Sequence, residues 1–287
     1  MTTKRLADTL ALSACVLAVS TASAFGRVAP DCPSGDGSDL VYANGFELPP
    51  PFAFTAFASD VSNDRFIAFD LLDPSIVVPV GPGSGTGFLM DFVGDDFSKV
   101  YGIDSFGTMI NTFASIDTAT GAITPIGVSL ASADASGWTG FKVDRTTGIA
   151  YAVATTCGSS SHLYTIDIDT GAATLVTEIP DLPCVYRIAI SPAGDMVGLD
   201  IAADTLYSID KTTGASAPIT SIGFDSSPYL DLDFDDSNGI LYYAGVITGT
   251  GSAQLRTIDP NALIGPLSAG LIAGFAIATS AGACPPH

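Results

Sequence analysis

Five related phrases recur along this chain at nearly even spacing. Each is a short apolar strand that ends in an aspartate: RFIAFD, FASID, LYTID, LYSID and LRTID. Neighbouring phrases lie 43 to 50 residues apart. The aspartates that close them are Asp70, Asp117, Asp167, Asp210 and Asp259. This spacing predicts a fold of similar units placed side by side, each made of several short strands.

One repeat divides into four short strands. Between residues 141 and 179 they are FKV, IAYAV, HLYTID and AATLVTEI. A four-stranded unit of this length is typical of one blade of a β-propeller. Alternation along each strand places side chains on both sheet faces, and neighbouring blades bury both.

The two ends of the chain predict a closed ring. After LRTID only one further strand follows, GFAIA at residues 274–278, whereas residues 52–80 supply the three strands FAFTAFA, RFIAFD and SIVVPV. We therefore expect an all-β, five-bladed β-propeller of four-stranded antiparallel blades. The C-terminal strand pairs with the N-terminal blade and closes the ring, which removes exposed sheet edges.

The acidic residues of the chain favour turns over helices. Of 30 acidic residues only Glu47 and Glu178 are glutamates, so the remainder are aspartates. An aspartate can accept hydrogen bonds from the backbone amides that follow it, and a glycine accepts the positive φ that ends a tight turn. The recurring D-x-x-T-G pattern predicts such turns between strands.

The N-terminus has the features of an export signal. Lys4 and Arg5 precede a mostly apolar stretch, and the small residues 22–24 (ASA) suit a signal peptidase. A less favoured alternative is a lipoprotein signal, in which LSAC would lead to lipidation of Cys15. We expect a secreted or periplasmic protein with a signal peptide at residues 1–24, a linker segment at 25–50 and a β-propeller domain at 51–287.

Removal of the signal peptide would leave four cysteines in an oxidising compartment, so two disulfides are expected. Cys157 and Cys184 lie in loops that the strand count puts on one face of adjacent blades, and we expect them to be bonded. Cys32 and Cys284 would then tie the chain ends together. With only two histidines and no CxxC motif, neither a zinc site nor a Cys-His nucleophile is supported.

The charge of the chain excludes one class of ligand. The net charge is −20 with ten scattered basic residues, whereas nucleic-acid binding needs clusters of Lys and Arg. After the signal segment, no apolar stretch reaches the length of a membrane span.

The D-x-x-T-G turns and the LYxID phrases resemble the repeats of secreted bacterial β-propellers of the quinoprotein-like and lactonase-like group, over roughly residues 51–280. The resemblance is at the level of the fold. Quinoprotein repeats carry a Trp after the T-G turn, whereas this chain has only Trp138, so a quinone cofactor is not expected. The phrase DLVYANGFE at residues 39–47 resembles a segment of exported proteins from Gram-negative bacteria and favours a bacterial envelope or secreted protein.

Binding residues are expected on the face of the ring that carries the longer connections. These connect the second strand of a blade to the third, and the fourth to the first strand of the next blade. On this long-loop face Trp138 and Tyr229 are the candidate binding residues, and the partner would be a protein or a glycan. The longer connections are residues 105–111, 128–138, 155–161, 179–184 and 223–229.

A second set of candidates lies on the innermost strands. Asp91, Lys142 and Asp233 share one level of the ring axis, and Arg187 and Asp231 lie one step nearer the long-loop face. In LDLDFDD, alternation puts Asp231 and Asp233 on one side of the strand, where carboxylates could bind calcium. The alternative is that these aspartates serve turns and ion pairs, with Arg187 and Lys142 as their partners.

Three functions remain open from the sequence. The first is a secreted recognition module that binds its partner on the long-loop face. The second is a carbohydrate-active or lactone hydrolase, in which Asp91 and Asp233 would act as the two acids. The third is a metal-stabilised structural protein of the envelope.

Overall fold

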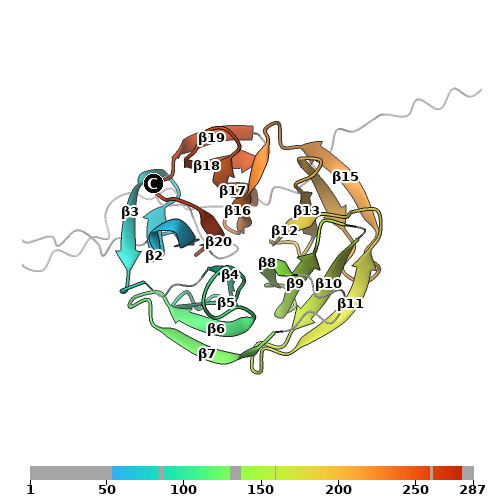
Figure 1. The fold of residues 1–287 in the computed structure, drawn as a ribbon, viewed down its shortest axis with the longest axis horizontal. Coiled ribbons are helices and arrows are strands. Elements are labelled where there is room, and N and C mark those ends of the chain that lie inside the picture. The colour runs from blue at the N-terminus through green and yellow to red at the C-terminus, as the bar shows by residue number, and fades with distance from the viewer. Residues whose placement is uncertain (1–53, 84–86, 130–136, 159, 259–260, 280–287) are drawn as a thin grey trace, which may run out of the picture.

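The computed structural model describes residues 54–83, 87–129, 137–158, 160–258 and 261–279. They form five four-stranded antiparallel sheets around a common axis, which confirms the predicted five-bladed β-propeller (Figure 1). The described residues contain no helix long and apolar enough to cross a membrane. The predicted signal peptide at residues 1–24, Cys15 and the predicted Cys32–Cys284 disulfide lie outside the described residues.

Each blade runs from an inner strand at the axis to an outer strand at the rim. Blade 1 consists of β20 (Ile272–Ile277), β1 (Ala56–Asp60), β2 (Arg65–Asp70) and β3 (Asp73–Val80). Blade 2 consists of β4 (Phe88–Phe92), β5 (Lys99–Asp104), β6 (Thr112–Asp117) and β7 (Ile123–Val128). Blade 3 consists of β8 (Gly137–Asp144), β9 (Ile149–Thr155), β10 (Ser161–Ile166) and β11 (Ala173–Ile179).

The remaining two blades follow the same order. Blade 4 consists of β12 (Val185–Ile190), β13 (Met196–Asp200), β14 (Thr205–Ile209) and β15 (Ser216–Ser221). Blade 5 consists of β16 (Ser226–Asp235), β17 (Ile240–Ile247), β18 (Ala253–Ile258) and β19 (Asn261–Pro266).

The ring closes as the ends of the sequence predict. β20 pairs antiparallel with β1, with Ala56 opposite Ile277 and Phe57 opposite Ala276. Beyond the strands, the amide of Ala278 donates to the carbonyl of Thr55 at 2.9 Å. The first and last described segments therefore lie side by side in blade 1.

The turns use the chemistry that the repeat predicts. After β14, the Asp210 carboxylate accepts the amides of Thr212 and Thr213 at 2.9 and 2.8 Å, and Gly214 ends the turn with φ 72°. The turns after Asp117 and Asp167 make the equivalent bonds. The aspartate excess of the chain is thus largely turn chemistry.

The apolar core is divided into five clusters, and each lies between two neighbouring blades. Between blades 4 and 5, for example, Val197 and Leu199 pack with Leu232 and Tyr243. The other four clusters fill the other junctions in the same way. Because both faces of every blade are buried, side chains from alternate positions of a strand enter different clusters.

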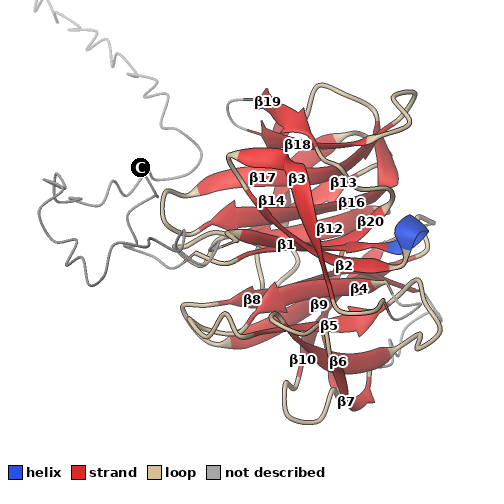
Figure 2. Cartoon of the chain, turned by 90° about the vertical axis from the view of Figure 1, so that its left-hand side faces the viewer, coloured by secondary structure: helices blue, strands red, loops and turns tan. Residues whose placement is uncertain are grey.

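The two faces of the ring differ in their connections. The long-loop face includes the short 3-10 helix η1 (Val61–Asn63), between β1 and β2. The opposite face carries the tight turns and is called the tight-turn face. β20 ends and β1 begins on the tight-turn face, and Figure 2 shows η1 on the other side of the ring.

Candidate functional site

Five charged side chains of the inner strands meet near the axis, and we call them the axial charge cluster: Asp91, Lys142, Arg187, Asp231 and Asp233. All five are buried, and Lys142 and Arg187 have 0% exposure. They come from β4, β8, β12 and β16, so four of the five blades contribute. The predicted placement of these residues at the axis agrees with their observed contacts.

Lys142 joins three other blades. Its Nζ donates to the carbonyls of Met90 on β4 and Phe275 on β20, at 3.3 and 2.6 Å. The same nitrogen lies 3.5 Å from a carboxylate oxygen of Asp231 and 3.5 Å from one of Asp233. An ammonium group has three donors, and these partners occupy them.

Arg187 uses all its N–H donors in hydrogen bonds to backbone carbonyls. Its Nε donates to Leu230 O at 2.5 Å and also lies 3.6 Å from a carboxylate oxygen of Asp231. Its two terminal nitrogens donate to the carbonyls of Thr139, Tyr186, Pro228 and Ala273. A guanidinium group has five N–H donors, so no donor of Arg187 is left to hold an anionic ligand.

Each carboxylate of the axial charge cluster accepts a hydrogen bond from a backbone amide on the inner strand of a neighbouring blade. Asp231 accepts the amide of Phe275 at 2.9 Å, and Asp233 accepts that of Ile277 at 2.7 Å. In the same way Asp91 accepts the amide of Val143 at 2.8 Å. The second oxygen of each accepts the amide of the following residue in its own strand. These bonds join β16 to β20 and β4 to β8.

Burial and charge shift the proton affinities of this cluster in opposite directions. Burial alone would lower the pKa of Lys142, but the neighbouring carboxylates of Asp231 and Asp233 outweigh it and raise that pKa. Burial raises the pKa of Asp233 well above its ordinary value, because Lys142 offsets only part of the effect and Asp91 adds like charge. The two carboxylates therefore stabilise the charged form of Lys142 despite its burial.

Calcium binding at Asp231 and Asp233 stays a prediction. Among the described residues no group of three or more His, Cys, Asp or Glu side chains is placed to hold a metal ion. Both carboxylates already accept two amides each, and the Lys142 ammonium lies beside both. A cation could bind the pair only by taking the place of that ammonium group.

The tight-turn end of the axis carries two charged residues that sequence reasoning missed, Arg145 and Asp236. Arg145 donates to a carboxylate oxygen of Asp236 at 2.5 Å. It also donates to the carbonyls of Ile277, the last residue of β20, and of Thr279, which follows the strand. Burial raises the pKa of Asp236 to about 6, with Arg145 opposing the shift and Asp91 adding to it. No local pattern marks this pair, because its members are 91 positions apart.

Trp138 is a core residue. Sequence reasoning placed it in a loop of the long-loop face, which is wrong, because it belongs to β8 and is only 3% exposed. Its indole N–H donates to Ser129 O at 3.0 Å, and its ring meets Tyr164 edge-on at 5.1 Å. The single tryptophan therefore packs between blades 2 and 3.

Tyr229, the other predicted binding residue, is half-buried on the long-loop face. We group it with Phe106 and Tyr186, two further half-buried rings at the long-loop ends of blades 2 and 4, and call the three the aromatic cluster. The rings of Phe106 and Tyr229 lie 6.1 Å apart, although they belong to blades 2 and 5. Tyr186 is the second residue of β12, the inner strand of blade 4, and the guanidinium carbon of Arg187 is 4.7 Å from its ring centre. Arg187 also donates to Pro228 O, on the residue before Tyr229, so it links the backbone segments that carry the two tyrosines.

Hydrogen bonds hold the backbone segments that carry Phe106 and Tyr229. Asp104, with 0% exposure, accepts the amides of Gly87, Phe106 and Gly107 on one oxygen and that of Met109 on the other. This one carboxylate fixes the loop that presents Phe106. The amide of Tyr229 donates to Ser227 Oγ at 3.2 Å, which shapes the start of β16.

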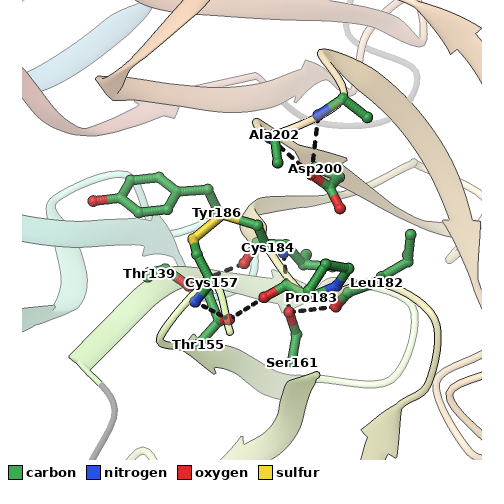
Figure 3. Close-up of a disulfide and its surroundings, with 12 residues drawn as sticks. Thr139, Thr155, Cys157, Ser161, Leu182, Pro183, Cys184, Tyr186, Asp200 and Ala202 are labelled. Carbon is green, nitrogen blue, oxygen red and sulfur yellow. Dashed lines mark hydrogen bonds between the residues drawn. A yellow bond between two sulfur atoms is a disulfide. The ribbon is translucent and has the colours of Figure 1, made fainter. Parts of the chain in front are cut away.

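The third loop is fixed by the predicted disulfide, which the structure confirms between Cys157 and Cys184. Thr155 Oγ1 donates to Pro183 O at 2.6 Å, and Ser161 Oγ donates to Leu182 O at 2.9 Å. Figure 3 shows these bonds around the disulfide, with the ring of Tyr186 pointing away from the sulfur atoms. The disulfide lies two residues before Tyr186 and so anchors the segment that carries it.

The comparisons with known proteins support the fold. No family model matches the sequence, and no curated protein matches it. Among solved structures, a chain of a nidogen/laminin complex is 12% identical with a TM-score of 0.51, and the match covers 79% of this chain and 98% of that one. At this identity the likeness shows the β-propeller fold alone.

Two further solved structures have lower scores. A candidate gluconolactonase is 12% identical, with 77% of each chain covered and a TM-score of 0.48. An aldose sugar dehydrogenase from Streptomyces coelicolor, in its PQQ-bound form, is 16% identical, with 62% of this chain and 61% of that one covered and a TM-score of 0.40.

Proposed function

We propose that this protein is a recognition module that binds its partner through the aromatic cluster of Phe106, Tyr186 and Tyr229. The observation that carries the proposal is the contact between the half-buried rings of Phe106 and Tyr229, from blades 2 and 5, with the half-buried Tyr186 of blade 4 tied to the Tyr229 segment through Arg187. Aromatic side chains on rigid supports give large contact areas at little cost in conformational entropy. The buried carboxylate of Asp104 and the Cys157–Cys184 disulfide provide that rigidity.

The arrangement at the axis favours binding over hydrolysis. A hydrolase with Asp91 and Asp233 as its acids would need both groups to reach a substrate. Both are at least 95% buried, and each accepts one amide of a neighbouring blade and one of its own strand. The hydrogen bonds of Asp91 and Asp233 hold neighbouring blades together.

An exported protein fits this role. The N-terminal signal and the disulfide both suit the periplasm or the extracellular space, where thiols oxidise. A recognition surface there would meet partners outside the cytosol.

The test compares three variants with the wild-type protein on a glycan array and a peptide array. Tyr186→Ala and Tyr229→Ala should lose the ligands that the wild type retains, with affinity reduced by about 30-fold or more if the rings are binding hot spots. Ile110→Ala is the matched control, because Ile110 is 62% exposed in the same loop as Phe106. It should bind as the wild type does.

Circular dichroism and melting curves must first show that the tyrosine variants are folded. Retention of every ligand by both tyrosine variants would overturn the proposal, and so would a wild-type protein that retains nothing on either array.

A further inference from the structure

The segments that carry the aromatic cluster offer little charge to a ligand. Residues 105–111, 180–187 and 222–229 include three charged side chains, Asp181, Arg187 and Asp225. Arg187 is buried and all its donors are used, whereas Asp181 and Asp225 are exposed. The charge that a ligand would meet at this surface is therefore negative or absent.

An anionic ligand is disfavoured by this distribution. No free cation faces it in these three segments, and the protein as a whole carries a charge of −20. Such a field lowers the local concentration of anions and slows their association. Phosphorylated, sulfated and acidic partners are thus poor candidates.

A cationic ligand is disfavoured at the rings themselves. Stacking of a cation on a ring needs an open face, and the guanidinium of Arg187 already lies 4.7 Å from the Tyr186 ring centre. A second cation placed on Tyr186 would lie close to that guanidinium in a poorly solvated position, where like charges repel strongly.

What remains for recognition is apolar ring surface and neutral hydrogen bonds. The half-buried side chains of Tyr186 and Tyr229 each end in a phenol hydroxyl. The hydroxyl of Ser105, next to Phe106, has no hydrogen-bond partner among the described residues, but it is too buried for a ligand to reach. Ring faces that end in hydroxyls suit a ligand that has both apolar C–H faces and hydroxyl groups.

From this chemistry we infer that the aromatic cluster binds an uncharged oligosaccharide, with sugar rings stacked on Tyr186 and Tyr229. The inference rests on the proposed function, since it names the ligand of the same surface. A pyranose ring has an apolar C–H face that stacks on an aromatic ring, and its hydroxyls can bond the phenol groups of the two tyrosines. Neutral partners of this kind need no counter-charge from the protein.

The experiment measures binding by calorimetry to five probes. Three are neutral, namely maltohexaose, cellohexaose and N-acetylchitohexaose, and two are charged, namely hexagalacturonate and hexalysine. At least one neutral probe should bind the wild-type protein, and neither charged probe should bind as tightly. Tyr229→Ala should weaken that binding by about 30-fold or more, and Tyr229→Phe by about 2- to 10-fold through loss of one neutral hydrogen bond.

Tyr186→Phe should behave as Tyr229→Phe does, and Ile110→Ala should bind as the wild type. The Phe variants keep the ring, so they report on the hydroxyls even if an Ala variant fails to fold. Failure of all neutral probes to bind would overturn the inference, as would neutral binding that no tyrosine variant changes. If hexalysine alone binds and Tyr229→Ala abolishes it, the recognition function stands and the oligosaccharide inference falls.

Discussion

Lys142 and Arg187 show what buried charge does at the scale of single residues. Lys142 donates to carbonyls of β4 and β20, and Arg187 donates to carbonyls of β8, β16 and β20. The two side chains therefore connect the inner strands of all five blades. Such groups are costly to bury unless every donor is used. Their role here is to fix how the inner strands meet.

Replacement of Lys142 by Met should destabilise the fold by about 3 to 5 kcal/mol, because Asp231 and Asp233 would stay buried without their cation. The free energy of unfolding in urea measures the effect. The loss should shrink as the pH falls, since the unpaired carboxylates then take up protons in the folded state.

Lys99→Met is the matched control, because Lys99 is exposed at the start of β5 in blade 2. It should change the unfolding free energy by less than about 0.5 kcal/mol. A Lys142→Met variant that unfolds as the wild type does would show that the ammonium group contributes nothing to the junctions.

Asp236 predicts a pH dependence of stability with a defined sign. Its folded-state pKa is raised from 3.8 to about 6, chiefly by burial. The folded protein therefore binds more protons than the unfolded chain between these two values, and stability falls as the pH rises through that window. The contribution is about 3 kcal/mol at most by the size of the shift.

Asp236→Asn should remove this fall in stability with rising pH. Free energies of unfolding measured at several pH values would then show a difference between wild type and variant that changes with pH. Asp210→Asn gives the opposite sign, because amide bonds from Thr213 and Thr212 lower the pKa of Asp210. There the wild-type advantage is present above the ordinary pKa and is lost as the pH falls. Parallel pH profiles for wild type and Asp236→Asn would contradict the shifted pKa.

At the scale of elements, the tight turns also hold neighbouring blades together. A Cβ on Gly214, in the turn between β14 and β15, would collide with the carbonyl oxygen of Glu178 on β11. Thr177 Oγ1 of the same strand donates to Thr213 O at 3.3 Å. Glycine is therefore needed at this turn for two reasons: the turn requires a positive φ, and blade 3 approaches too closely for a Cβ atom.

A pair of substitutions separates these two roles. Gly214 and Gly239 both have φ 72°, but a Cβ on Gly239 would meet nothing within 4 Å. Gly239→Ala should cost about 1 to 2 kcal/mol for the left-handed backbone alone. Gly214→Ala should cost about 1 to 3 kcal/mol more through the collision with β11, as measured by urea unfolding. Equal losses would show that the contact between the blades yields easily.

The strands and turns were predictable because their causes are local. The aspartate and glycine of each turn and the alternation of each strand lie within a few residues, so the repeat shows them directly. The axial charge cluster was predicted as a set of positions, but the carbonyls that occupy Arg187 come from the adjacent Tyr186 and from three other segments of the chain. Phe106 was missed because its contact with Tyr229 depends on the closure of the ring.

At the scale of the whole molecule, most positively charged side chains pair with carboxylates. Among the described residues, the side chains of Arg65, Lys142, Arg145, Arg187 and Lys211 all lie within 4 Å of a carboxylate. These five cations thus serve contacts within the protein. The aspartates divide between the interior, where Asp60 and Asp104 are among those buried, and the surface, where Asp95 and Asp181 are among those exposed. An outer surface of this kind keeps anions away and leaves the aromatic cluster to neutral contacts.

The pairing of β1 with β20 also sets the order in which the molecule can form. Ala56 pairs with Ile277, so the blade that is begun first is completed last. Until residues 272–277 arrive, β1 keeps an exposed edge that can pair with another chain. Closing so long a loop costs conformational entropy before its contacts form, so the ring should close late and slowly. The two ends of the chain must therefore be present together before the ring can close.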